Sequence, residues 1–169
     1  MKEQKMALVT GGTSGVGLSI VKALLRENYR VVLVGSNNSK GKKIEAELNP
    51  VGETNAAFVC VDLGNLGSVC EFAEQFAATH SRLDLLVNAA GIVLPRRELT
   101  PEGFEKTFAV GYLSPFILSL KLAGLLKKYG GARIVNVAAA SKTILKIRLD
   151  LDDLSFSKSY NGFHTSLHT

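Results

Sequence analysis

A cluster of glycines near the start of the chain has the spacing of a loop that binds a phosphate chain. Gly11, Gly15 and Gly17 follow a short apolar run at residues 7–9 and precede a helical pattern that begins at Leu18. In a strand, glycine turn and helix of this kind, backbone N–H groups approach the phosphates closely, and the helix N-terminus supplies about half a positive charge. The sequence therefore predicts a cradle for the diphosphate of a dinucleotide.

The elements that must hold this loop alternate regularly along the first 137 residues. Short, almost wholly apolar runs are typical of strands in a parallel sheet covered on both faces, and they occur at residues 7–9, 30–34, 57–61, 85–88 and 133–137. Helical periodicity separates them at residues 15–28, 39–48, 66–80 and 101–129. This alternation, with right-handed crossovers, predicts an α/β fold with a doubly wound parallel sheet.

The last and longest of these helices has signals at both ends. Thr100 is expected to be its N-cap and Pro101 its first residue, and the pair Gly130-Gly131 is expected to end it. Pro115 should bend the helix or split it, because proline lacks the N–H that a helix interior uses.

Composition and length exclude several classes of protein. The chain has 169 residues, of which 46% are hydrophobic and 21% charged, as expected for one globular domain rather than a disordered chain. No apolar run approaches the roughly 18 residues that span a bilayer, and the apolar stretch near the start is too short for a signal peptide. Cys60 and Cys70 lack the spacing of a metal site, so we expect reduced, buried thiols in a cytoplasmic protein and no metal ligands.

The excess of positive charge favours a small anionic ligand. The formal net charge is +5, but the lysines and arginines form no continuous basic stripe on any expected helix and have no aromatic residues between them. Nucleic acid is therefore not expected as a partner.

Four further motifs follow the glycine loop in a fixed order. They are Val61-Asp62-Leu63, Asn88-Ala89-Ala90-Gly91, Phe108-Ala109-Val110 and the fifth expected strand, Arg133-Ile134-Val135-Asn136-Val137. Together with the glycine pattern Thr-Gly-x-x-x-Gly-x-Gly, this set resembles the short-chain dehydrogenase/reductase family over nearly the whole chain. The resemblance implies a Rossmann-like sheet of order 3-2-1-4-5 and the NAD(P)-dependent oxidation or reduction of an alcohol or carbonyl group.

The resemblance also implies which residues would hold the cofactor. Asp62 would accept a hydrogen bond from the adenine amino group, with Leu63 beside it, and Val110 would pack near the adenine. A loop or helix-cap role for Asp62 stays open, as does a purely structural role for the strand-end amide of Asn88. The residues that would lie along the adenosine ribose are Asn88, Ala89, Ala90 and Gly91. Those that would form or line the turn at the diphosphate are Gly11, Thr13, Ser14, Gly15, Val16 and Gly17.

The end of the second expected strand bears on the choice between NAD and NADP. A site selective for NAD has Asp or Glu about 20 residues past the glycines, bound to the ribose 2′-hydroxyl. Here the sequence Val34-Gly35-Ser36-Asn37-Asn38 has no carboxylate. Ser36 and Asn37 can donate to a 2′-phosphate and Lys40 is close in sequence, although the arginine of many NADP-using relatives is absent. We therefore expect NADP to be preferred, with NAD as the alternative.

The residues with which the family transfers protons are absent from this chain. Gly111 stands where a helix asparagine would support a proton relay, and Ala139 where a serine would hold the substrate oxygen. No Tyr-x-x-x-Lys follows residue 137. Two substitutes are less favoured: Ser141 brought in by a bulge, and Tyr160 paired with His164, a largely neutral imidazole at the lysine position. No catalytic residue is therefore predicted.

Residues 142–169 differ in character from the dinucleotide-binding domain expected at residues 1–141. Apolar and polar residues alternate here as in a short half-exposed strand, with the apolar ones at Leu145, Ile147, Leu149 and Leu151. The sequence from Leu149 to Phe156 resembles an insertion that retinol-dehydrogenase-like members carry before their active-site tyrosine. The resemblance implies that residues 142–169 are an insertion-like tail. It also implies that the chain is truncated before Tyr-x-x-x-Lys and the family's last strands and helices, and is inactive as it stands.

A chain of this kind would leave apolar surface uncovered. The fifth strand would be a sheet edge with unpaired backbone groups, so we expect self-association. The long-helix residues expected to be exposed are Phe104, Phe108, Leu113, Phe116 and Leu120. A small alcohol or carbonyl substrate would bind only if a C-terminal half exists. The alternative functions are a non-catalytic dinucleotide-binding sensor or interaction module, and a truncated product without function.

Overall fold

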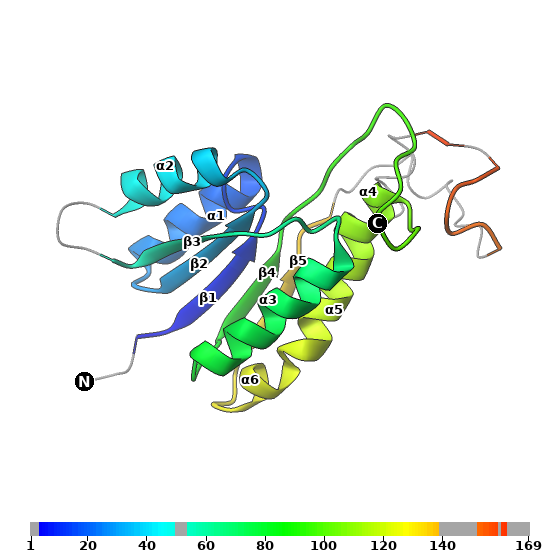
Figure 1. The fold of residues 1–169 in the computed structure, drawn as a ribbon. Coiled ribbons are helices and arrows are strands. Elements are labelled where there is room, and N and C mark those ends of the chain that lie inside the picture. The colour runs from blue at the N-terminus through cyan, green and yellow to red at the C-terminus, as the bar shows by residue number, and fades with distance from the viewer. Residues whose placement is uncertain (1–3, 50–53, 139–151, 159, 162–169) are drawn as a thin grey trace.

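A parallel β-sheet forms the centre of the molecule. The structure is a computed structural model that describes residues 4–49, 54–138, 152–158 and 160–161. Within these ranges, five strands lie in the order β3-β2-β1-β4-β5 (Figure 1). Their bounds are β1 Met6–Thr10, β2 Arg30–Gly35, β3 Ala56–Cys60, β4 Leu85–Asn88 and β5 Arg133–Asn136. The predicted fold class and the strand order 3-2-1-4-5 are both confirmed.

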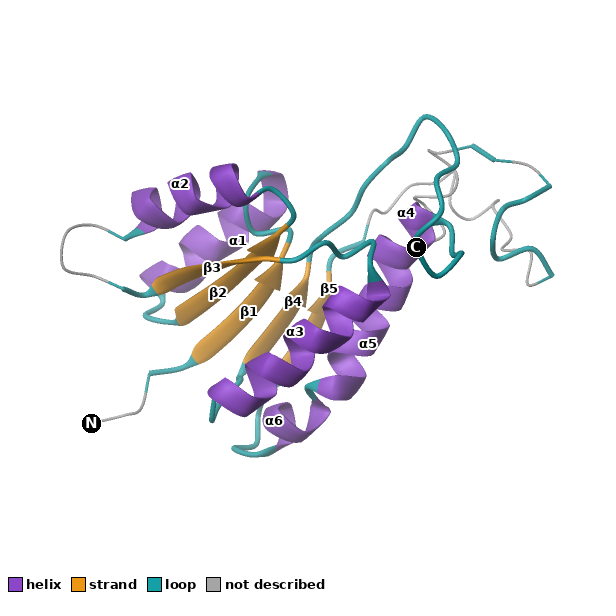
Figure 2. Cartoon of the chain, in the orientation of Figure 1, coloured by secondary structure: helices purple, strands orange, loops and turns teal. Residues whose placement is uncertain are grey.

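Helices cover both faces of this sheet (Figure 2). One face carries α1 (Gly15–Arg26) and α2 (Asn38–Leu48). The other face carries α3 (Leu66–Thr79), α5 (Ser114–Lys121) and α6 (Ala123–Lys127). Two shorter segments lead into α5, namely α4 (Lys106–Phe108) and the π-helical turn η1 (Ala109–Leu113).

The central strand β1 is buried on both faces because its side chains alternate between two apolar cores. Leu8 packs with the side chains of α3, α5 and α6, whereas Ala7 and Val9 pack with those of α1 and α2. Every residue of β1 is buried, which explains why this strand reads as an uninterrupted apolar run. The sheet therefore holds the loop after β1 on a rigid base.

The predicted start of the long helix expected at residues 101–129 is wrong. Leu99 and Glu105 form an isolated antiparallel bridge, and Gly103 adopts a positive φ of 87° between them, so residues 99–105 make a turn. The helix begins at Lys106, and the N-cap is Glu105 rather than Thr100. The buried carboxylate of Glu105 accepts hydrogen bonds from the N–H groups of residues 107 and 108, at 2.9 and 2.7 Å.

Pro115 marks a change of helix type rather than a break, since the residues from 106 to 121 are helical without interruption. It lies in the first turn of α5, directly after the π-helical turn Ala109–Leu113. The i→i−5 bonds of a π-helical turn accommodate the loss of the i→i−4 hydrogen bond that a proline cannot make. A break at Leu122, with φ −92° and ψ 0°, separates α5 from α6.

Strand β5 is an edge of the sheet as the structure describes it. Ile134, Val135 and Val137 are each more than 40% exposed there. Phe104, Phe116 and Leu120 are exposed as expected, whereas Leu113 is only half-exposed. The expectation for Phe108 is wrong: it is 5% exposed, and its ring stacks on that of Tyr112.

The two cysteines are free. Both were expected to be buried, and neither is. Cys60 is exposed because it ends β3, the strand at the opposite edge of the sheet, and its Sγ lies 3.5 Å from the carbonyl oxygen of Ser36. Cys70 is half-buried in α3.

Part of the C-terminal segment packs against the loop after β4. The carboxylate of Asp153 accepts hydrogen bonds from the N–H groups of Ser157 and Lys158, and these bonds hold its pKa well below the usual range. Arg97 donates from Nε to the carbonyl oxygen of Ser155 at 2.8 Å. Ala139, Ser141, His164 and the strand expected around residues 145–151 lie outside the described residues.

Candidate functional site

A cavity of about 700 Å³ lies where the carboxyl ends of the parallel strands meet. Such an edge is the usual ligand site of an open α/β sheet. The lining residues named in the sequence analysis are Gly11, Thr13, Ser14, Val16, Gly17, Ser36, Asp62, Leu63, Ala89, Ala90, Gly91 and Val110. Those that were not expected are Gly35, Val61, Ile92, Leu94, Lys106 and Val137. Gly15, Asn37 and Asn88 do not line this cavity.

The glycine loop is shaped by close backbone contacts. A Cβ on Gly17 would lie 2.3 Å from the carbonyl oxygen of Gly11, and a Cβ on Gly11 would lie 2.8 Å from Cα of Ala90. Gly11 also adopts a positive φ of 66°. Gly15 has open space around it but a positive φ of 52°, so its conformation rather than its size requires glycine. The loop can therefore bring bare backbone up to a ligand.

The N-terminus of α1 opens on this loop. Ser14 is the N-cap with extended backbone, and its side chain makes no capping hydrogen bond. The first N–H groups of a helix have no partner within it, and those of α1 belong to Gly15, Val16 and Gly17. A serine hydroxyl, unpartnered N–H groups and the positive end of a helix dipole together suit a phosphate group.

Thr10 fastens this loop to the end of β4. Its buried Oγ1 accepts hydrogen bonds from the N–H groups of Ala89 at 3.1 Å and Ala90 at 3.2 Å. Thr10 was not among the expected site residues, although it begins the glycine pattern. The threonine in that pattern is the signal that could have identified it.

The end of β3 supplies a carboxylate at the cavity wall. Asp62 is exposed, and its Oδ1 accepts a hydrogen bond from the N–H of Gly64 at 2.8 Å. The carbonyl oxygen of Leu63 accepts a 2.6 Å hydrogen bond from the buried hydroxyl of Ser114, which ties this turn to α5. Asp62 thus shapes its own loop and faces the cavity, so the two readings of this residue are compatible.

Ser36 and Asn37, the two polar residues after β2 that were expected to act together, have different surroundings. Ser36 lines the cavity, whereas Asn37 is the N-cap of α2 and its Oδ1 accepts a hydrogen bond from the N–H of Lys40 at 2.9 Å. Helix capping therefore explains Asn37 better than a ligand contact. Lys40, in the first turn of α2, does not line the cavity either.

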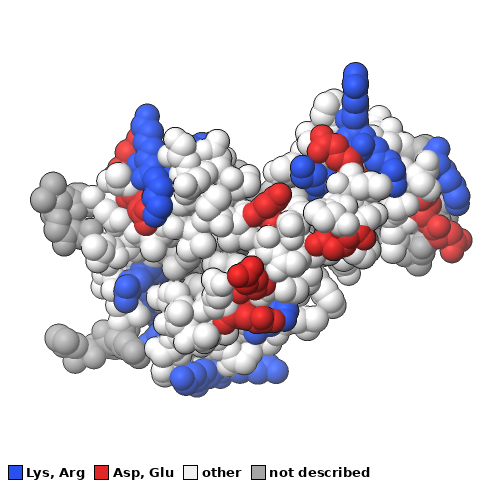
Figure 3. All heavy atoms as spheres, viewed as in Figure 1, with Lys and Arg blue, Asp and Glu red and all other residues white. Residues whose placement is uncertain are grey.

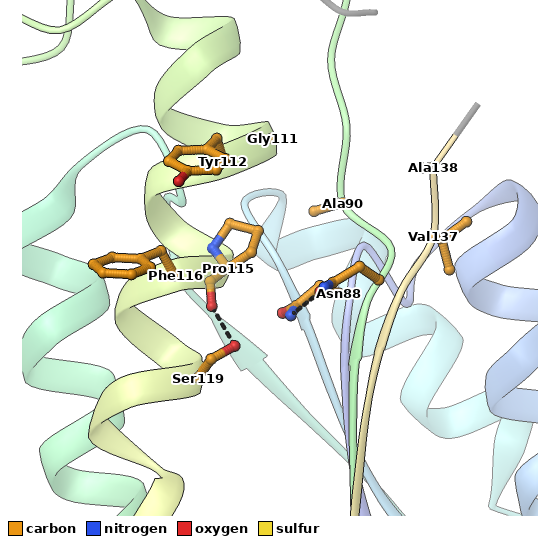
Figure 4. A pocket seen from close by; sticks show the side chains of 10 residues that line it. Asn88, Ala90, Gly111, Tyr112, Pro115, Phe116, Ser119, Val137 and Ala138 are labelled. Atoms are coloured by element: carbon orange, nitrogen blue, oxygen red, sulfur yellow. Dashed lines mark hydrogen bonds between the residues drawn. The ribbon is translucent and has the colours of Figure 1, made fainter. Parts of the chain in front are cut away.

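Asn88 faces a second, smaller pocket of about 250 Å³ between the sheet and α5 (Figure 4). Its Nδ2 donates to Oδ1 of Asn136, its register partner on β5, at 2.8 Å. Its own Oδ1 is buried and accepts no hydrogen bond from the described residues. Ala90 and Val137 line both pockets, so the two pockets adjoin at the ends of β4 and β5. The bond to Asn136 is consistent with a structural role for Asn88, and a role along the cofactor stays a prediction.

Gly111 also lines this smaller pocket and contributes no side chain to it. Pro115 and Ser119 lie across from Asn88 in Figure 4, and the Ser119 hydroxyl donates back to the carbonyl oxygen of Pro115 at 2.6 Å. The hydroxyl of Tyr160 donates to the carbonyl oxygen of Leu94, in the loop after β4, at 3.1 Å. That contact makes Tyr160 a loop tyrosine, as its sequence context indicates.

The charges around the main cavity are few. Asp62 and Lys106 are the charged residues among those described as lining it. On the face drawn in Figure 3, basic and acidic side chains are interspersed. Within the described ranges, no three His, Cys, Asp or Glu side chains gather as a metal site would require.

The sequence model of the family described as short chain dehydrogenase matches residues 5–145. The chain belongs to the short-chain dehydrogenase family. The chain is 33% identical over 167 residues to polyprenol dehydrogenase of Homo sapiens, a match that covers 95% of this chain and 49% of that protein. It is 34% identical over 161 residues to retinol dehydrogenase 12 of Bos taurus, covering 94% and 50%. The chain spans about half the length of the curated relatives it matches.

Solved short-chain dehydrogenase structures share this fold. A metagenomic short-chain oxidoreductase in complex with NADP superposes with a TM-score of 0.72 and 25% identity, covering 97% of this chain and 70% of that chain. A blue fluorescent protein from a metagenomic library in complex with NADPH has a TM-score of 0.67 and 27% identity, covering 80% and 56%. The family resemblance expected from the motifs is thus confirmed, and a nicotinamide dinucleotide is the cofactor that the family assignment supports. Separately, no helix among the described residues is long and apolar enough to cross a membrane.

Proposed function

We propose that this chain is the dinucleotide-binding portion of a short-chain dehydrogenase/reductase and that it binds NADP in preference to NAD. The glycine loop carries the proposal, because neither Gly11, whose backbone lies against Ala90, nor Gly17, whose backbone lies against Gly11, has room for a side chain. This arrangement, at the positive end of α1, fits a diphosphate. When bound, the cofactor supplies or accepts the hydride in the family's alcohol and carbonyl chemistry.

The preference for NADP rests on the end of β2. Ser36 lines the cavity next to Gly35, and no carboxylate stands in the segment Ser36-Asn37-Asn38 to accept a bond from a ribose 2′-hydroxyl or to repel a 2′-phosphate. The solved relatives named above were crystallised with NADP and NADPH. Asn37 is removed from this part of the proposal, because it caps α2.

We further propose that this 169-residue chain does not turn over alcohols or carbonyls by itself. Gly111 offers no polar group at the smaller pocket, and Ala139 follows β5 where the family has a serine. No Tyr-x-x-x-Lys follows residue 137. An alkoxide formed during reduction would therefore have no proton donor of the kind that the family uses. A cytoplasmic location and self-association belong to the same proposal and rest on the two free cysteines and the exposed β5 edge.

The test is a fluorescence titration of the folded chain with NADPH and with NADH, repeated with Ser36→Asp. The wild-type chain should bind NADPH more tightly than NADH, and Ser36→Asp should reverse the order by placing a carboxylate at the 2′ position. Stoichiometric binding without consumption of NADPH in the presence of ketones and aldehydes supports the inactive module. Failure to bind either dinucleotide would refute the function, and turnover would refute the inactivity.

A further inference from the structure

Lys106 brings a cation to the wall of the main cavity beside Asp62. A Cβ on Gly64 would lie 3.2 Å from Oδ1 of Asp62 and also 3.2 Å from Cε of Lys106, so both side chains border the same small space. Val110, one helical turn after Lys106, lines the same cavity. The methylene stem of Lys106 thus forms part of the cavity wall, as lysine stems do on apolar surfaces.

The ammonium group of Lys106 is paired with the carboxylate of Glu98. Its Nζ lies 3.2 Å from Oε2 of Glu98. The backbone also fixes this pairing, because the N–H of Lys106 donates to the carbonyl oxygen of Glu98 at 3.0 Å. Both side chains are partly exposed, so the ion pair contributes little free energy. Its effect is on the position of the Lys106 ammonium group.

Without Glu98, the Asp62 carboxylate is an acceptor on the same side of the cavity. Oδ1 of Asp62 and Cε of Lys106 each lie 3.2 Å from the same point beside Gly64, so they are at most twice that distance apart, and rotation about the last bonds of the stem would bring Nζ toward the carboxylate. In the described residues, Oδ1 of Asp62 is used by the N–H of Gly64 and Oδ2 has no hydrogen bond. An ion pair with Lys106 would therefore occupy the oxygen that a ligand's amino group needs.

We propose that Glu98 is a positioning residue that keeps the Lys106 ammonium off Asp62, so that Asp62 is free to accept a hydrogen bond from the exocyclic amino group of a purine. The proposal rests on the proposed function, since it takes the base of the dinucleotide to lie against Asp62, Leu63 and Val110. It goes further by assigning a role to Glu98 and Lys106, which lie outside the glycine loop and its motifs.

The experiment measures NADPH binding to the full chain for Glu98→Gln, Lys106→Met and the double variant. At low salt, Glu98→Gln should weaken binding about three- to fivefold, the scale of an exposed ion pair formed in competition with the ligand. The same substitution should have no further effect when Lys106 is Met, because no ammonium remains to move. The loss should also shrink at high salt, because screening weakens a pair of exposed charges.

The control is Glu74→Gln, which breaks the comparable exposed pair with Lys121 (2.7 Å) on α3 and α5, away from the cavity, and should leave affinity unchanged. Reduced nicotinamide mononucleotide, which lacks the purine, should bind equally to wild type and Glu98→Gln. An equal loss in the Lys106→Met background, or with the mononucleotide, would overturn the role of Glu98. A wild-type chain that binds no dinucleotide at all would instead overturn the proposed function beneath it.

Discussion

Thr10 Oγ1 accepts a hydrogen bond from the N–H of Ala90 at 3.2 Å, joining residues that are 80 positions apart in the chain. The same oxygen accepts from the N–H of Ala89 at 3.1 Å. One buried side chain thus satisfies two backbone donors just beyond the end of β4, where the chain leaves the sheet to line the cavity. The loop after β1 and the loop after β4 are held together at this point.

Thr10→Val should therefore lower the free energy of unfolding by about 1–3 kcal/mol, because it keeps the shape of the side chain but leaves two partly buried N–H groups without their acceptor. Urea unfolding measures this change. Thr10→Ser retains the oxygen and should lose less than the valine variant. Equal stability of the valine variant and the wild type would show that water replaces the hydroxyl.

Gly17→Ala should disrupt the cradle, because its Cβ would lie 2.3 Å from the carbonyl oxygen of Gly11, closer than any relaxed contact. We expect NADPH affinity to fall at least about tenfold, which corresponds to roughly 1.4 kcal/mol. Fluorescence titration measures it. Gly124→Ala is the matched control, since nothing lies within 4 Å of its Cβ in α6, and it should leave affinity unchanged while favouring the helix. Identical binding by the two variants would contradict this account.

Asp84 should make stability sensitive to acid. Partial burial acts to raise the pKa of its carboxyl group, but hydrogen bonds from the Arg82 guanidinium and the N–H of Met6, with the charges of Arg82 and Lys5, outweigh it and lower the pKa below the ordinary value. A lowered pKa means that the ionised form stabilises the fold above about pH 4 and that this contribution is lost as the pH falls toward the folded-state pKa.

Asp84→Asn should cost about 1–3 kcal/mol at pH 7, the worth of hydrogen bonds to a charged group, and should flatten the fall in stability below about pH 4. Urea unfolding at pH 7, 5 and 3 measures both effects. Glu47→Gln, at an exposed position on α2, should change neither. A parallel loss of stability in wild type and Asp84→Asn between pH 5 and 3 would exclude Asp84 as the source.

Strands β1, β2 and β4 could be predicted because they are apolar runs largely buried within the sheet, and β5 because it is apolar although it is exposed at the sheet edge. The glycine spacing predicts the cradle, because glycine allows backbone conformations that other residues adopt less readily. The start of the long helix could not be predicted. Thr100 and Pro101 have the local signature of a helix start, yet the Leu99–Glu105 bridge makes residues 99–105 a turn, and the fully buried carboxylate of Glu105 caps the helix instead.

Within the candidate site, Asn37 and Lys106 also show what could not be predicted from the sequence. Both Asn37 and Ser36 carry groups that could bind a phosphate, but capping of α2 turns Asn37 away from the cavity while Ser36 remains on its wall. Lys106 lies in no recognised motif and reaches the cavity because the helix begins at that residue.

By itself, the sequence determined the α/β architecture, because alternating apolar runs and helical periodicity depend on local sequence, and the resemblance of its motifs led to the family and the strand order. The phosphate cradle stays a prediction that rests on the glycine spacing. Only the tertiary structure decided which polar side chains face the cavity and which are used by the fold. That choice depends on hydrogen bonds between segments far apart in the chain, such as those of Thr10 and Ser114, and no local pattern encodes them.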